Sequence, residues 1–168
     1  GRQGMAFGAV RLVSSPDWGN VGRTFDGFRT AWAGKTNRID AFYVRPVLVY
    51  RYDSNRSDDS TVFYGFYGTV KSPKTKRLLD YYVLTLHTNP AAGDMERYTP
   101  GARFAGPLVG NLSIDAEVAM QFGEMRAGAT ELDIDAGMAV LDLRYLFKGA
   151  TWEPLVTFGY DYASGDES

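Results

Sequence analysis

The sequence has no cysteine, one histidine, no large excess of either charge and no long apolar run. The lack of cysteine excludes disulfides, thiolate metal sites and cysteine nucleophiles. The 18 Lys and Arg residues nearly balance the 20 Asp and Glu residues, so no basic field indicates nucleic acid as a partner. No stretch approaches 18 uninterrupted apolar residues, which excludes a transmembrane helix but not a transmembrane β-barrel.

Aromatic residues and glycines are plentiful instead. Aromatics make up 14% of the chain and 19 residues are glycine, a combination that favours strands over helices. Apolar side chains alternate in residues 112–124 with Asp115, Glu117 and Gln121, so the two faces of this strand are cleanly separated. Residues 152–162 repeat the alternation with an almost wholly aromatic face. The sequence therefore predicts an all-β chain.

About nine strands are expected, and most are longer than the usual strand of 5 or 6 residues. The predicted strands are 3–13, 25–33, 39–52, 61–71, 78–88, 97–105, 112–124, 134–147 and 152–162. Their connections alternate between compact turns (34–38, 72–77, 106–111 and 148–151) and longer polar segments (14–24, 53–60, 89–96 and 126–133). This asymmetry predicts an antiparallel up-and-down meander and is typical of outer-membrane β-barrels.

The cost of placing charge in lipid predicts the direction of the faces. An Arg or Lys facing lipid at the bilayer midplane costs about 2–4 kcal/mol. The strand arginines are therefore expected to face inward, and five aromatics, several of them near strand ends, are expected to face lipid. The arginines are Arg29, Arg45, Arg97 and Arg103, and the aromatics are Trp32, Tyr50, Tyr98, Trp152 and Tyr162. The pattern leaves an alternative open, a soluble β-sandwich or lipocalin-like barrel with a carbohydrate-binding or structural role.

Few residues suggest catalysis or metal binding. Asp115 and Glu117 lie two apart on one strand face, as do Asp133 and Asp135, but no apolar pocket is evident that would raise the pKa of a carboxyl for acid catalysis. His87 stands alone. Residues 53–59 have the composition of a calcium loop without its downstream glycine and glutamate. We expect no enzyme activity, no metal and no cofactor.

Several short motifs carry a resemblance to a known family. In order along the chain they are Asp17-Trp18-Gly19-Asn20, Gly22-Arg23-Thr24-Phe25-Asp26-Gly27-Phe28-Arg29, Ile39-Asp40-Ala41-Phe42, Phe63-Tyr64-Gly65-Phe66-Tyr67-Gly68-Thr69, Arg97-Tyr98-Thr99-Pro100-Gly101-Ala102-Arg103, Glu117 with Gln121-Phe122-Gly123, and Gly159-Tyr160-Asp161-Tyr162-Ala163-Ser164-Gly165-Asp166. This ordered set resembles the alginate export family of Gram-negative outer-membrane proteins, over nearly the whole chain.

The resemblance implies a monomeric barrel of eighteen strands whose electropositive lumen lets an anionic polysaccharide leave the periplasm passively. The inward arginines of the family would correspond to Arg29, Arg45, Arg97 and Arg103, and its inward carboxylates to residues such as Asp115 and Glu117; Gln121 completes the expected lumen set. Arginine suits this task because its planar fork binds carboxylates and keeps its charge. Alternatively, the same arginines pair with carboxylates on adjacent strands and brace the inner wall.

Nine strands are half the number that the resemblance implies, and single-chain bacterial barrels have an even number. We therefore expect residues 1–168 to be one partial barrel domain of a longer chain, in preference to one of several copies that complete a pore. The expected location is the bacterial outer membrane. The expected partners are an anionic polysaccharide or related polar solute and outer-membrane lipid, with periplasmic export machinery as a further candidate.

Overall fold

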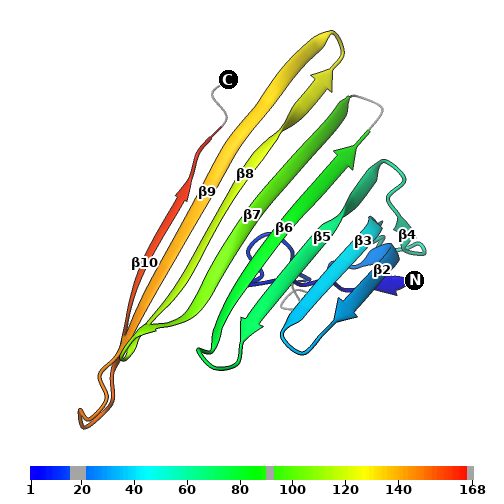
Figure 1. Cartoon of the computed structure of the whole chain (residues 1–168). Coiled ribbons are helices and arrows are strands. Elements are labelled where there is room, and N and C mark those ends of the chain that lie inside the picture. Colours follow the sequence, from blue (N-terminus) through cyan, green and yellow to red (C-terminus); the bar gives the residue numbers. More distant parts are fainter. Residues whose placement is uncertain (16–21, 90–92, 166–168) are drawn as a thin grey trace.

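The computed structural model describes residues 1–15, 22–89 and 93–165. Within these ranges the regular structure is entirely β: ten antiparallel strands form one sheet (Figure 1). The strands are β1 (Arg2–Gln3), β2 (Phe25–Ala33), β3 (Asn37–Leu48), β4 (Arg56–Ser57), β5 (Thr61–Ser72), β6 (Arg77–Thr88), β7 (Asp94–Val109), β8 (Leu112–Ala127), β9 (Thr130–Leu146) and β10 (Leu155–Ala163). The same ranges contain no helix long and apolar enough to cross a membrane.

The strands follow one another across the sheet in chain order. The order is β1-β2-β3-β5-β6-β7-β8-β9-β10, and the two-residue β4 pairs only with β3. The predicted all-β, up-and-down architecture is confirmed. Eight of the nine predicted strands correspond to long strands, because alternating side chains fit a sheet with two different faces.

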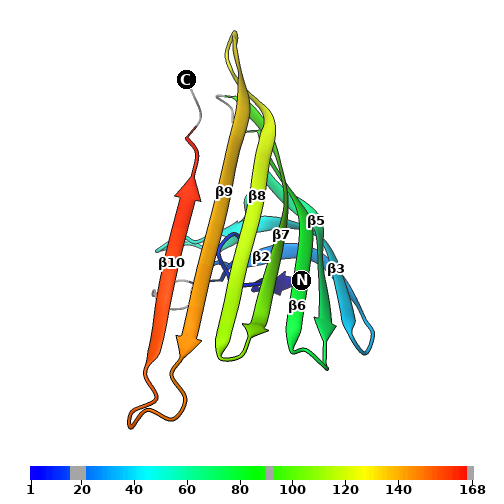
Figure 2. The same cartoon turned by 60° about the vertical axis from the view of Figure 1, so that its left-hand side comes forward.

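The sheet is curved and open in the described part of the chain. Figure 2 shows β10 and β2 toward opposite ends of the curve, with residues 4–15 on its inner side. All nine residues of β10 are exposed. The arrangement is consistent with part of the wall of a β-barrel. We call the inner face of the sheet the concave face and the outer one the convex face.

The predicted strand 3–13 is wrong. Only Arg2 and Gln3 pair with β2, and residues 4–15, which we call the interior segment, cross the concave face without joining the sheet. Positive φ angles at Gly8 (57°) and Val10 (56°) break the extended backbone there. The amide of Val10 donates to the Phe7 carbonyl at 3.0 Å, which closes a turn.

The predicted sorting of short and long connections is only partly correct. One rim, at the lower left of Figure 1, holds connections 34–36, 73–76, 110–111 and 147–154; we call it the lower rim. At the opposite, upper rim, β8 and β9 are joined by Gly128 and Ala129 alone, so the long segment expected at 126–133 does not exist. The polar residues there continue the strands, because Arg126 pairs with Glu124 and Glu131. Most of the 14–24 connection, with the motif at 17–20, lies outside the described residues.

The convex face carries most of the exposed aromatic and aliphatic side chains of the described strands. One cross-strand row consists of Phe28, Tyr43, Tyr64, Thr85, Tyr98 and Phe122. Ring centroids in this row are 5.9 Å apart for Tyr43 and Tyr64 and 5.6 Å apart for Tyr98 and Phe122. The next convex positions toward the upper rim include Asp26, Arg45, Glu96 and Glu124. On these strands the convex face thus changes from aromatic to charged, as at the interfacial end of a membrane strand.

The hydrophobic core lies between the concave face and the interior segment. Its buried members are Met5, Phe7, Val13, Phe25, Phe42, Val44, Tyr67, Tyr82, Leu84 and Ala119. The three members from the interior segment are apolar side chains, each worth about 1.5–3 kcal/mol when fully buried. The interior segment is therefore an integral part of the fold.

Candidate solute pathway on the concave face

Aromatic stacking fixes the interior segment at the middle of the concave face. The Phe7 ring stacks on Tyr67 at 4.8 Å and on Phe42 at 5.5 Å between centroids, and Tyr67 stacks on Tyr82 at 5.3 Å. The guanidinium carbon of Arg29 lies 5.0 Å from the centroid of the Phe7 ring. Phe7 thus contacts residues of β2, β3 and β5, and Tyr82 of β6 extends the stack through Tyr67.

Gly8 lets the segment approach the sheet closely. A Cβ atom at this position would overlap the hydroxyl of Tyr67 and lie 3.6 Å from a carboxylate oxygen of Asp80. The positive φ of Gly8 is also one that other residues rarely adopt. Steric and conformational requirements therefore both select glycine here.

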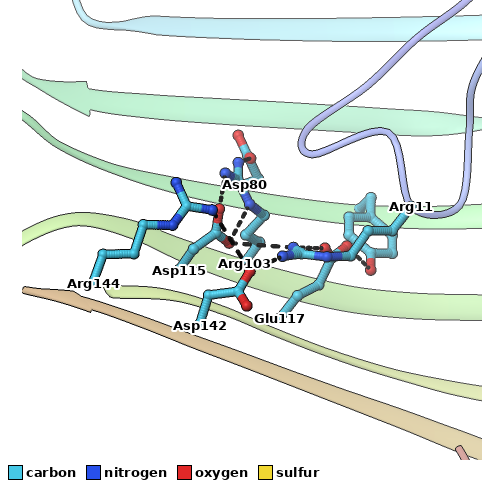
Figure 3. Close-up of polar contacts among 8 residues, drawn as sticks. Arg11, Asp80, Arg103, Asp115, Glu117, Asp142 and Arg144 are labelled. Carbon is cyan, nitrogen blue, oxygen red and sulfur yellow. Dashed lines mark hydrogen bonds and ion pairs between the residues drawn. The ribbon is translucent and has the colours of Figure 1, made fainter. Parts of the chain in front are cut away.

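Seven charged residues meet beside the segment. This interior charge cluster consists of Arg11, Asp80, Arg103, Asp115, Glu117, Asp142 and Arg144 (Figure 3). Arg11 comes from the interior segment, and its Nη1 donates to Glu117 at 2.8 Å and to Asp115 at 3.2 Å. Its Nη2 donates to Asp142 at 3.1 Å. Arg11 thus ties the segment to both β8 and β9.

Arg103 is the most enclosed cation of the interior charge cluster. Its Nη2 and Nε donate to the two oxygens of Asp115 at 2.6 and 2.8 Å, and its Nη1 donates to Asp80 at 2.9 Å. The Tyr82 hydroxyl donates to Glu117 at 2.9 Å. Three arginines face four carboxylates, so the formal charge of the cluster is −1. The cluster therefore braces the wall without adding positive charge to it.

A second ionic group lies closer to the lower rim. Arg29 and Arg38 lie 2.8 and 2.6 Å from the carboxylate of Asp40, which is buried. Arg29 and Asp40 belong to adjacent strands and Arg38 to the same strand as Asp40. The carboxylate is satisfied by two cations, which leaves one net positive charge here.

The structure places the predicted site residues in three environments. Arg29, Arg103, Asp115 and Glu117 are on the concave face and take part in ion pairs. Arg97 and Gln121 are also on the concave face and line a cavity near the upper rim. Arg97 makes no ion pair with any described residue.

Arg45 differs from the expectation that it faces inward. It registers opposite Asp26 on the convex side and lies 2.6 Å from Asp59 of the connection after β3. The cost of charge in lipid does not apply to it, because it lies beyond the aromatic row, toward the upper rim. The rule that strand arginines face inward fails at a strand end.

Sequence reasoning missed Arg11, because it assigned residues 3–13 to a strand of the wall. The available signal was Gly8, which interrupts an otherwise apolar run and indicates a bend.

Two cavities lie on either side of the interior segment. The upper cavity, of about 510 Å³, is lined by Leu12, Val13 and Ser14 from the segment. The lower cavity has a volume of about 410 Å³, and Gly8 is the residue of the segment that contributes to its lining. The segment therefore separates two spaces on the concave face, one near each rim.

The remaining titratable groups do not form a site. Among the described residues, no three His, Asp or Glu side chains are placed to hold a metal ion. His87 lies 3.6 Å from Asp94 on the convex side. In the connection after β3, the amide and hydroxyl of Ser60 donate to Asp58, and the hydroxyl bond holds the pKa of that carboxyl below its usual value. Asp58 is thus engaged in a local turn.

Comparison with known proteins supplies the family. A search of the curated proteins finds no match. The family of alginate export proteins matches residues 1–168, which is the whole chain. This family consists of outer-membrane porins and is a transport family, not an enzyme family. Given this match and the antiparallel up-and-down sheet, the chain belongs to the alginate export family.

Proposed function

We propose that the chain forms part of the wall of an outer-membrane channel through which an anionic polysaccharide, or a related polar solute, passes by diffusion. Family membership supports an export role in general. The observation that carries the specific proposal is the lining of the lower cavity, where Lys35 and Lys71 make no ion pair with a described residue. Arg38, Arg103 and Asp80 also line this cavity, but these three take part in ion pairs. Rings of basic side chains set anion preference in pores.

The anion preference that we propose comes from cations that no carboxylate neutralises. Arg103 and Arg29 are committed to Asp115, Asp80 and Asp40. Arg97 has no such partner among the described residues, and it lines the upper cavity. Conduction requires attraction without tight holding, so a few unpaired cations serve it better than many.

The prediction for Arg97 separates selectivity from bracing. We expect Arg97→Gln to lower the anion-to-cation permeability ratio about fourfold, because a unit charge about 10 Å from an ion in water is worth about 0.4 kcal/mol, which favours the anion about twofold and disfavours the cation about twofold. Reversal potentials of the intact protein in planar bilayers under a salt gradient measure this ratio. Arg45→Gln is the matched control, with the same charge lost on the convex side. Equal effects of the two variants would show that the preference does not arise on the concave face.

We further propose that the convex face contacts outer-membrane lipid and that residues 1–168 form one partial barrel domain. The exposed apolar side chains of the convex face support the first part. The fully exposed β10 supports the second, because its free edge can pair with a further strand.

Val118 tests the lipid assignment. It is 58% exposed on the convex face. We expect Val118→Arg to make folding into lipid vesicles less favourable by about 2–4 kcal/mol. Gln121→Arg introduces the same side chain on the concave face of the same strand and is expected to insert nearly as well as the unaltered protein. The folded and unfolded forms are separated by their heat-modifiable electrophoretic mobility. Following this mobility through a urea titration measures the folding free energy of both variants. A loss no greater for Val118→Arg than for Gln121→Arg contradicts a lipid-facing convex surface.

A further inference from the structure

We propose that the upper cavity is a binding site for a small carboxylate with an apolar body, such as a medium-chain fatty acid. The proposal rests on the proposed channel function and deepens it, because it adds a second solute class to the polar anions that suit the lower cavity. Its basis is the pairing of an unneutralised guanidinium with an apolar wall.

The apolar wall comes from both sides of the upper cavity. Leu12 and Val13 contribute from the interior segment, and Phe63, Leu84 and Leu86 contribute from β5 and β6. Apolar surface that faces water in a lumen is unfavourable by roughly 25 cal/mol per Å². An alkyl chain that covers this wall removes that surface from water, which a polyhydroxylated sugar does less well.

The polar end of the site is adjacent to this wall. Arg97 on β7 registers directly opposite Leu86 on β6, and Thr99 registers opposite Leu84. On its other side Arg97 registers opposite Gly123, which has no side chain. Gln121 from β8 lines the cavity, as does a second arginine, Arg23, which precedes β2. A guanidinium with no ion pair among the described residues can bind a carboxylate through two parallel hydrogen bonds.

The lower cavity has a different chemistry, which is why the assignment is confined to the upper one. Four of its lining residues are basic, and its largest apolar side chain is Leu78. Such a surface attracts a hydrated polyanion but offers little to an alkyl chain. The interior segment separates the two cavities, so each can bind its own class of solute.

Isothermal titration calorimetry on the intact protein in detergent tests the site, with hexanoate, acetate, glucuronate and neutral hexanamide as probes. We expect hexanoate to bind at least tenfold more tightly than each of the other three. In Arg97→Gln the advantage over hexanamide falls, and in the double variant with Arg23→Gln it disappears, while some preference for the longer chain remains. In Leu86→Asn the advantage over acetate falls while the preference for the anion remains.

Equal affinities of the unaltered protein for hexanoate and acetate overturn the proposal, and this comparison needs no variant. A hexanoate preference that survives both Leu86→Asn and Leu12→Asn also overturns it, because the alkyl chain must then bind elsewhere. Bilayer conductance reports separately on the channel. An anion-preferring pore without hexanoate binding refutes only this site, whereas a protein that forms no conducting pore refutes the proposed function.

Discussion

Replacing Arg103 by methionine is expected to destabilise the fold by about 3–5 kcal/mol, because it leaves the buried carboxylate of Asp80 without its counterion. The side chain of Asp80 is 3% exposed and that of Arg103 is 11% exposed. Asp115 would lose both of its bonds to Arg103 and Asp80 its ion pair. Urea titration of the protein in detergent or lipid measures the loss.

Arg144→Met is the matched control for Arg103→Met. Arg144 is half-exposed and lies 3.8 Å from Asp142, so we expect a change of less than about 1 kcal/mol. Arg103→Lys keeps the positive charge but not the planar guanidinium that binds Asp115 through two bonds. We therefore expect an intermediate loss of stability. Equal stability of the two methionine variants would show that Arg103 does not brace the wall. It would favour the alternative role of Arg103 in anion selectivity.

Releasing the interior segment is expected to widen the pathway. Phe7→Ala removes the ring that stacks on Phe42 and Tyr67, at a cost of about 3–5 kcal/mol. Arg11→Gln in addition leaves Asp115, Glu117 and Asp142 without the cation between them. We expect the double variant to conduct more current per channel, with larger fluctuations, in planar bilayers.

Proteolysis and a charge control complete the test of the interior segment. A protease added from either side should cut the segment only in the Phe7→Ala, Arg11→Gln protein, since docking protects it in the unaltered one. Arg2→Gln removes the same charge from a residue that pairs with Asp26 on the convex side, and its conductance should match that of the unaltered protein. Unchanged conductance together with a cleaved segment would show that the segment does not narrow the pathway.

The sequence alone predicts the wall well, because alternation is a local property. The predicted strand 112–124 falls within β8, and the predicted 25–33 coincides with β2. The same signal fails at residues 3–13. Alternating apolar residues there fit either a strand or a segment packed on another surface, and only the rest of the sheet supplies that surface. The tight β8–β9 turn was missed for a related reason, since polar residues continue a strand when charged partners lie opposite them.

The ion pairs could not be predicted, because they depend on register. Arg103 meets Asp80 and Asp115 only because β6, β7 and β8 pair in one particular alignment. The sequence offers the interpretation that inward arginines and carboxylates neutralise one another, and Arg29 and Arg103 do form such ion pairs. For Arg45 the relevant fact is its position beyond the aromatic row, which follows from where the neighbouring strands place their aromatics.

The bond from Arg11 to Asp142 joins residues that are 131 positions apart. A contact of such sequence separation forms late, because the intervening chain must first be ordered. The earliest residues of this chain thus complete their packing only after β9 has been added to the sheet. Docking of the interior segment can therefore be complete only when β8 and β9 are in register, because Arg11 binds carboxylates on both strands.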